Sequence, residues 1–318
     1  MANDIILSVR DLKKYFSTKN GELHAVDGVS FDIPRGTTLG VVGESGCGKS
    51  TLGRVILHLL QRTSGTICFD GEDISDVSPK RLHELRREMQ IIFQDPFSSI
   101  DPRKTVSEII GEPLLVHKLV DNSADYEKRV REIMDTVGLA RRLENSYPHE
   151  LDGGRRQRIG IGRALMLQPK FIVCDEPVSA LDVSIQAQIL NLMQDLQKEL
   201  DLTYMFITHD LSVVYHISDE IMVMYLGQVI EKAPTEKLFA NPVHPYTQAL
   251  LSAIPVPSIH NRRERILMTG ELTSPIDPLP ECRFANRCRF ATGKCRESEP
   301  QLREIEPGHF VSCFLCEA

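Results

Sequence analysis

The chain has 318 residues, of which 42% are hydrophobic and 25% are charged, and its formal net charge is -7. This length predicts one large domain with an appendage or two domains, with enough apolar residues for a sizeable core. The negative charge gives no electrostatic case for binding nucleic acid. The sequence lacks a secretion signal and any apolar run of the roughly 18–20 residues that span a membrane. We therefore expect a cytoplasmic protein that works at a membrane only through partners.

The first part of the chain alternates short apolar runs with helical patterns, which predicts a mostly parallel sheet covered on both faces. Strands are expected, in chain order, at residues 5–10, 29–33, 38–42, 65–69, 171–174, 203–207, 221–225 and 228–232. Helices are expected at about 49–60, at 79–90, across most of 104–170, and at 184–199 and 210–217. Residues 255–318 are rich in Pro, Arg and Cys and have little periodicity, which predicts a small irregular appendage in need of a staple.

Residues 43–50 read GESGCGKS and match the phosphate-loop pattern G-x-x-x-x-G-K-[ST]. The context is correct, because an expected buried strand precedes the loop and an expected helix follows it. Glycines let backbone N–H groups close around phosphate oxygens, and the helix directs its positive end to the same anion. We expect Lys49 to reach the β- and γ-phosphates and Ser50 to bind Mg²⁺. The expected nucleotide contacts are Gly43, Ser45, Gly46, Cys47, Gly48, Lys49, Ser50 and Thr51.

A second apolar strand, at 171–174, ends in two carboxylates, Asp175 and Glu176. In phosphate-loop enzymes the first acid holds Mg²⁺, and the next can orient or deprotonate the attacking water. Such a pair is also found at ordinary strand ends, so its meaning depends on the phosphate loop upstream.

The order of the remaining motifs resembles the ATP-binding subunits of ABC transporters. Residues 151–155 (LDGGR) are similar to the family's signature, which usually reads LSGGQ, and lie about a hundred residues after the phosphate loop. Single residues at other family positions are Phe16, next to Tyr15, for the aromatic that stacks on adenine; Gln94; Asp182 in the loop to the partner subunit; and His209 as the switch histidine. Residues 244–251 (HPYTQALL) and the cysteine-bearing tail extend the resemblance to dipeptide and oligopeptide importers over essentially the whole chain.

This resemblance implies a P-loop ABC ATPase domain over residues 1–254, with a mostly parallel core sheet, an antiparallel N-terminal β-part and a helical insert at about 95–160. It implies ATP and Mg²⁺ as cofactors, with Ser50, Gln94 and Asp175 toward the metal, Glu176 as the base, and His209 toward the γ-phosphate. Two such subunits would close head to tail, so that Leu151, Asp152, Gly153, Gly154 and Arg155 contact the partner's ATP. The expected partners are a second ATPase subunit, two transmembrane permease subunits and, indirectly, an extracellular peptide-binding protein, at the cytoplasmic face of the membrane.

The signature departs from the family pattern at two positions. Asp152 stands where the family has serine, and Arg155 stands where it has glutamine. A carboxylate cannot donate a hydrogen bond to a γ-phosphate and brings negative charge toward it. Arg155 would offset part of this effect if it folds back on Asp152. We expect a weakened contribution to the partner's site. Either the pair of ATPases is naturally asymmetric, with one impaired site, or the signature has been altered from its natural form. The sequence does not say whether the second ATPase is a copy of this chain, but Asp152 favours a different one, because a homodimer would carry the change twice.

Five of the eight cysteines crowd the C-terminal tail, which in a cytosolic chain indicates metal or redox chemistry. Cys282, Cys288, Cys295 and Cys313 would suit tetrahedral zinc or a [4Fe–4S] cluster. The resemblance favours the cluster, because some peptide-importer subunits carry one in this segment, and leaves zinc as the second choice. The cysteines could also be free thiols, and Cys316 could replace Cys313 as a ligand.

Other interpretations remain open at this stage. The chain could power import of another solute, such as nickel, or act as a non-transport ABC ATPase in DNA repair or translation. Repair types carry a long coiled-coil insert, and translation types usually carry two cassettes in one chain. An iron–sulfur module with a vestigial ATP site is a further possibility. In the insert, Phe97, Ile100 and Leu114 could line a groove for the membrane subunit or could equally belong to the core.

Overall fold

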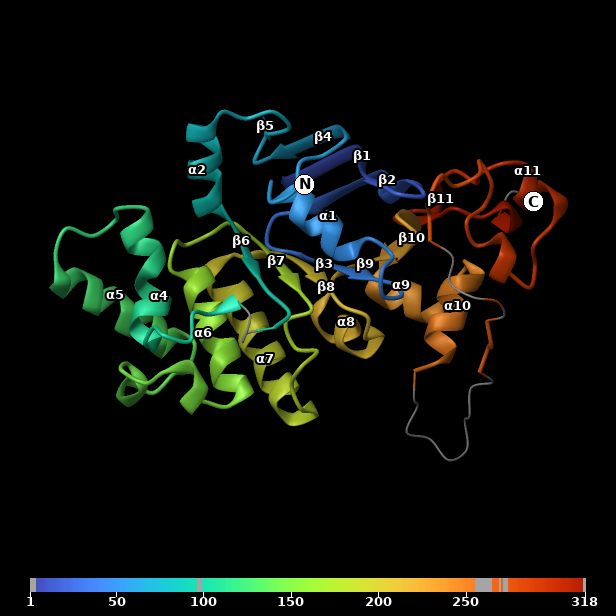
Figure 1. Ribbon diagram of the computed structural model, residues 1–318. Coiled ribbons are helices and arrows are strands. Elements are labelled where there is room, and N and C mark those ends of the chain that lie inside the picture. Colours follow the sequence, from blue (N-terminus) through green and yellow to red (C-terminus); the bar gives the residue numbers. More distant parts are fainter. Residues whose placement is uncertain (1–3, 96–98, 255–264, 269, 271–273, 317–318) are drawn as a thin grey trace. The chain divides into compact units, whose positions relative to one another are not determined.

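The computed structural model describes residues 4–95, 99–254, 265–268, 270 and 274–316 (Figure 1). The chain divides into two compact units, one formed by Met1–Asp76 together with Phe206–Ala318, and the other by Val77–Met205. The phosphate loop and the cysteine tail belong to the first unit, whereas the acidic pair and the signature belong to the second.

The first unit opens with an antiparallel sheet, as predicted for the N-terminal part. Strands β1 (Ile5–Thr18) and β2 (Gly21–Pro34) pair along their length, and β4 (Ser64–Phe69) and β5 (Glu72–Asp73) complete the order β2-β1-β4-β5. The sequence pattern indicated only residues 5–10 and 29–33 as strands. The observed strands continue to a tight turn because cross-strand pairs, such as Tyr15 with His24, extend the ladder into polar sequence.

A second sheet in this unit surrounds the predicted phosphate loop. Strand β3 (Thr38–Val42) pairs in parallel with β9 (Glu220–Tyr225), and β9 forms the predicted hairpin with β10 (Gln228–Pro234). Strand β8 (Thr203–Ile207) begins in the second unit and ends in the first, where the N–H of Thr208 donates to the carbonyl of Val41 over 3.1 Å. The helices of this unit are α1 (Lys49–Ile56), α8 (Leu211–Ile217), α9 (Thr235–Ala240) and α10 (Pro245–Ser252).

The C-terminal appendage is more regular than the sequence predicted. It adds β11 (Arg303–Glu306), β12 (His309–Val311), the short helix α11 (Gly293–Glu297) and two 3-10 turns, η3 (Ala285–Arg287) and η4 (Phe314–Cys316). Strand β12 pairs with β10, whose edge would otherwise present unpaired backbone groups. The prediction of an irregular segment missed these strands because three or four residues are too few to show a period.

The appendage also shares the apolar core of the first unit. Phe284 is 3% exposed, and its ring centroid lies 5.3 Å from that of Tyr225 and 5.4 Å from that of Tyr246. His309 of β12 and Glu231 of β10 form a pair in which both side chains are fully buried, with Nε2 and Oε1 2.8 Å apart. These contacts join the appendage to β10 and α10.

The second unit combines two parallel strands with helices. Strand β6 (Met89–Ile92), which the sequence pattern did not indicate, pairs with β7 (Phe171–Asp175). Its helices are α2 (Pro79–Glu88), α4 (Val106–Val116), α5 (Ser123–Thr136), α6 (Gly153–Leu165) and α7 (Val183–Leu200), with 3-10 turns η1 (Arg141–Leu143) and η2 (Pro148–Glu150). Figure 1 shows α4, α5 and α6 gathered beside one another, and α4 contacts both α5 and α6.

Two of the three residues considered for a groove in the insert are core residues. Ile100 is 4% exposed and Leu114 is fully buried, so neither offers apolar surface to a partner, and Phe97 lies outside the described residues. Within the described ranges, no helix is long and apolar enough to cross a membrane.

Candidate nucleotide-binding site

The phosphate loop runs from β3 into α1 as the sequence predicted, and its glycines have a steric reason. Gly43 has φ of +151°, and a Cβ there would lie 2.2 Å from the carbonyl oxygen of Met224. Gly48 has φ of +104°, and a Cβ there would lie 2.0 Å from the carbonyl oxygen of Ala25. Neither distance is tolerable for a side chain, so the chain can pass this closely between its neighbours only with glycine.

Lys49 and the start of α1 give the loop its positive character. The Lys49 side chain is 5% exposed, and its Nζ donates to the carbonyl oxygens of Gly43 (2.7 Å) and Glu44 (3.0 Å). The N-cap of α1 is Gly48, no side chain caps the helix, and its first turn contains no acidic residue. The first N–H groups and the dipole of α1 are therefore open to an anion.

A support of the loop that the sequence reading did not identify comes from the start of α10. The Tyr246 hydroxyl accepts a hydrogen bond from the N–H of Glu44 over 2.9 Å. Tyr246 is fixed in turn by His244, whose Nδ1 accepts from the N–H of Tyr246 over 3.1 Å. Burial lowers the pKa of His244 to about 3, which keeps this acceptor neutral. The motif HPYTQALL, which carries the resemblance to peptide importers, supplies Tyr246 to hold Glu44 and forms the buried side of α10.

The acidic pair lies at the end of β7, in the second unit. Asp175 is 3% exposed, and Glu176 follows it with φ of +51°, in the left-handed region that few non-glycine residues adopt. The Gln94 Nε2 donates to Glu176 Oε2 over 3.0 Å, although 82 residues separate the two. The structure thus brings together the predicted base and the predicted glutamine, and the amide oxygen of Gln94 is left for a further contact.

The signature residues lie at the start of α6. The two that depart from the family pattern, Asp152 and Arg155, contact each other. Asp152 is the N-cap, and its Oδ1 accepts from the N–H of Arg155 over 2.8 Å. The Arg155 guanidinium also folds back on the carboxylate, with Nη1 3.5 Å from Oδ2. Aspartate is among the best N-cap residues, so the helix tolerates it in place of serine. A Cβ on Gly154 would lie 2.6 Å from Ile185, which explains why this position is glycine.

The remaining nucleotide-site candidates lie on both units. Tyr15 stacks on His24 with ring centroids 3.8 Å apart, and its hydroxyl donates to Asp27. Phe16 is partly exposed, and the Lys14 ammonium lies over its ring, 4.6 Å from the centroid. Of these two aromatics, Phe16 is therefore better placed to stack on a base. His209 is an exposed residue between β8 and α8, and Asp182 caps α7 by accepting from the N–H of Ile185 over 3.0 Å.

All eight cysteines are free, and those of the tail are neighbours. Burial, with the nearby thiols of Cys295 and Cys288, raises the pKa of Cys282 to about 11. Burial, with the thiols of Cys316, Cys282 and Cys288, raises the pKa of Cys313 to about 12. Nevertheless, no group of three or more His, Cys, Asp or Glu in the described part of the chain is arranged to hold a metal ion. The structure therefore does not support the predicted metal site, since a metal ion needs several ligands that converge on one point.

Comparisons with known proteins agree with this geometry. A family model described as "ABC transporter" matches residues 26–179, and one described as "Oligopeptide/dipeptide transporter, C-terminal region" matches residues 230–295. The chain is 51% identical to the oligopeptide transport ATP-binding protein AppF of Bacillus subtilis (strain 168), over 98% of both chains. It is 50% identical to the dipeptide transport ATP-binding protein DppF of Haemophilus influenzae, over 98% of this chain and 97% of that protein.

Solved structures are similar over the ATPase part. The cbiO1 protein of Clostridium perfringens, described as part of the ABC transporter complex cbiONQ, has a TM-score of 0.67 and 31% identity, covering 75% of this chain and 92% of that one. A dimeric cassette, MJ0796, bound to ADP and Pi, has a TM-score of 0.66 and 27% identity, covering 72% of this chain and 99% of that one.

The fold, the phosphate loop and these likenesses define an ATP-binding cassette of the ABC type. Within that class, the chain belongs to the ATP-binding proteins of the oligopeptide and dipeptide ABC transporter family. It is an ATPase subunit coupled to transport.

Proposed function

We propose that this chain hydrolyses ATP to drive import of dipeptides or oligopeptides, working at the cytoplasmic face of the membrane with two permease subunits and an extracellular peptide-binding protein. The observation that carries this proposal is the near full-length likeness to peptide-transport ATP-binding proteins, which includes the C-terminal region at residues 230–295. The intact phosphate loop and acidic pair support an active ATPase and not a vestigial site.

The residues divide the work of hydrolysis among them. Lys49 and the open N-terminus of α1 bind the β- and γ-phosphates, and Phe16 stacks on adenine. Glu176, oriented by Gln94, accepts the proton of the attacking water. His209 contacts the γ-phosphate, and Asp182 contacts the partner ATPase subunit.

Ser50, Gln94 and Asp175 would hold the Mg²⁺ ion. Their donors are a hydroxyl, an amide oxygen and a carboxylate, the hard oxygen ligands that Mg²⁺ prefers. When bound, the ion neutralises charge on the β- and γ-phosphates. The protein's own contribution is to hold Asp175 buried at the end of β7 and to orient Glu176 through Gln94.

A second ATPase subunit completes each site. Leu151, Asp152, Gly153, Gly154 and Arg155 face the ATP of that partner, and the Asp152 carboxylate weakens this contribution. A homodimer would carry the weakness in both sites, so the partner is a different chain whose own signature serves the phosphate loop described here.

The function is tested in vesicles that contain this chain, its partner ATPase and the permease subunits, with the binding protein added outside. We expect ATP-dependent uptake of a labelled dipeptide or oligopeptide, lost in Glu176→Gln. Uptake of nickel without peptide uptake would assign another solute. ATP hydrolysis that is indifferent to the permease and the binding protein would contradict the transport function.

For the tail, the finer proposal is a [4Fe–4S] cluster on Cys282, Cys288, Cys295 and Cys313. It rests on the family resemblance, because the described thiols lie near one another but are not arranged to hold a metal ion. Metal and acid-labile sulfide are measured on protein purified without oxygen, and about four irons and four sulfides per chain are expected. One zinc without sulfide, or neither metal, would refute the cluster and leave the ATPase assignment intact.

A further inference from the structure

Two arginines of the cysteine-bearing appendage reach the phosphate-loop region of the first unit. Arg287, immediately before Cys288, forms two bonds to Glu44, with Nη1–Oε2 at 2.6 Å and Nη2–Oε1 at 3.0 Å. The two side chains are largely buried, with exposed fractions of 10% for Arg287 and 24% for Glu44. Such a two-pronged pair fixes the carboxylate in position as well as in charge.

Glu44 is the second residue of the loop that binds phosphate, and it is fixed at three points. Its N–H donates to Tyr246, its carbonyl accepts from Lys49, and its carboxylate accepts from Arg287. Because Lys49 contacts the same residue, a shift of Glu44 would displace the lysine that reaches for the phosphates. A carboxylate without a cation at this point would also repel the phosphates by like charge.

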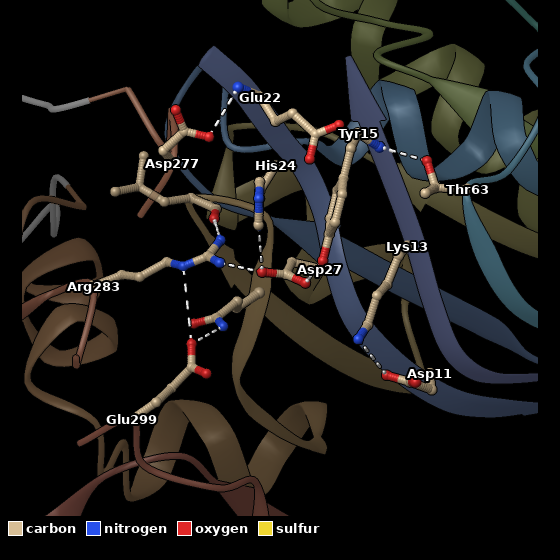
Figure 2. A network of polar contacts seen from close by, with 12 residues as sticks. Asp11, Lys13, Tyr15, Glu22, His24, Asp27, Thr63, Asp277, Arg283 and Glu299 are labelled. Atoms are coloured by element: carbon tan, nitrogen blue, oxygen red, sulfur yellow. Dashed lines mark hydrogen bonds and ion pairs between the residues drawn. The ribbon is translucent and has the colours of Figure 1, made fainter. Parts of the chain in front are cut away.

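Arg283, immediately after Cys282, contacts residues that neighbour the phosphate loop. Figure 2 shows its guanidinium directed at Asp27, and it also donates to the carbonyl of Leu226. Gly227 follows in that turn, and its N–H donates to the carbonyl of Cys47 over 2.9 Å, while its carbonyl accepts from the N–H of Asp27 over 2.9 Å. The arginine therefore holds the turn that contacts the phosphate loop near Gly48.

The neighbours of Asp27 extend this network to the two N-terminal strands. Tyr15 and His24 both contact the Asp27 carboxylate, and Figure 2 shows these side chains converging on it. Burial would raise the pKa of Asp27, but hydrogen bonds from Tyr15, His24 and Arg283 lower it, so the residue is a stable anion for the arginine. Hydrogen bonds thus link the appendage both to the phosphate loop and to strands β1 and β2.

We propose that Arg287 is a positioning residue for ATP, which neutralises Glu44 and holds the phosphate loop in its binding shape, so that the C-terminal appendage sets the nucleotide affinity of this subunit. Arg283 supports the same loop through the turn at Leu226–Gly227. The proposal concerns binding and leaves the chemistry to Glu176, which lies in the other unit. It rests on the ATPase activity assigned above.

The test is a set of full-length variants assayed for ATP affinity by calorimetry and for hydrolysis in the assembled transporter. Arg287→Gln should weaken ATP binding and raise the KM for ATP by about tenfold, the scale of one charged hydrogen bond, with kcat changed less than about twofold. Arg287→Lys keeps the charge but loses the two-pronged pair with Glu44. Its KM for ATP should lie between those of Arg287→Gln and the wild type.

A double variant separates loop positioning from general damage. If the unpaired Glu44 carboxylate causes the loss, Glu44→Gln/Arg287→Gln should bind ATP more tightly than Arg287→Gln alone. Additive losses in the double variant would overturn the proposal. Should Arg287→Gln fail to fold, Arg287→Lys is compared with Arg289→Lys: a weaker ATP affinity in Arg287→Lys alone supports the proposal, and equal affinities overturn it.

Arg289→Gln is the matched control, because Arg289 flanks Cys288 on the other side and lies over the ring of Phe290, with its Cζ 4.7 Å from the centroid. It should keep the wild-type ATP affinity. Equal losses in the variants at 287 and 289 would mean that the effect runs through Cys288, and would refute the role of Glu44. A wild-type chain that binds no ATP would instead refute the assigned function.

Discussion

The phosphate loop and the signature are both glycine-rich segments that open a helix, yet their helix ends differ in charge. At α1 the N-cap is Gly48, with no capping side chain and no acid in the first turn. At α6 the N-cap is Asp152, whose carboxylate accepts from the N–H of Arg155 and pairs with its guanidinium. The positive end of α1 is open to an anion, whereas that of α6 already holds an anion of its own.

This difference gives a physical reason for the proposed asymmetry of the two ATP sites. A phosphate that approaches α6 would have to compete with the Asp152 carboxylate for the same N–H groups and would meet like charge. A phosphate that approaches α1 meets Lys49 and a helix N-terminus with no capping side chain and no acidic residue in its first turn. This contrast supports the proposal that the chain binds its own ATP well and contributes weakly to its partner's site.

The largest expected effect separates catalysis from ATP binding. Glu176→Gln keeps the shape of the side chain and its approach to Gln94 but cannot accept a proton. We expect kcat of the assembled transporter to fall by about 10²–10⁴, with ATP affinity unchanged. Glu199→Gln, an exposed change near the end of α7, is the control. A kcat within a few-fold of wild type would remove Glu176 as the base.

The next effect tests the histidine that supports the loop through Tyr246. The folded pKa of His244 is about 3, and its ordinary value is 6.5, so between these values the unfolded chain binds more protons. The free energy of unfolding should therefore fall as the pH drops below about 6.5. The buried His244 should lower it by about 2 kcal/mol at pH 5.

Chemical denaturation from pH 7 to pH 5 measures this loss for the wild type and for His244→Asn. The variant keeps an acceptor near Nδ1 but has no proton to bind, so its stability should depend less on pH. His216→Asn, on the exposed part of α8, serves as the control. Identical pH slopes for His244→Asn and the wild type would contradict the assignment.

The smallest expected effect comes from substitutions of Asp152 in the signature. Asp152→Ala removes the N-cap and should lower the free energy of unfolding by about 1 kcal/mol. Asp152→Ser keeps a cap and restores a hydroxyl donor, so stability should hold while ATP turnover of the transporter rises. Thermal unfolding and the ATPase rate measure the two outcomes. A lower turnover in Asp152→Ser would show that the carboxylate is needed and that the two helix ends are not functionally opposed.

The local elements of the ATPase part were well predicted from sequence. Strand β3, the phosphate loop and β8 have the predicted bounds, because short buried strands bordered by glycine or by charge are evident in the residue pattern. Strand β6 was missed because four residues after a helix show no period of their own. The hydrogen bond between Gln94 and Glu176 was not predicted, since nothing local joins residues 82 positions apart.

The residue order alone predicts three local features: a phosphate loop, an acidic strand end and a signature with Asp152 in place of serine. These are short-range features, because each depends on residue types within one turn or one strand. Only the tertiary structure decided what holds the loop in place, namely Tyr246 and Arg287 on Glu44, and how the appendage docks on β10 through His309 and Glu231. Such contacts join residues from about 80 to more than 240 positions apart, and their specificity comes from burial and geometry that only the folded chain creates.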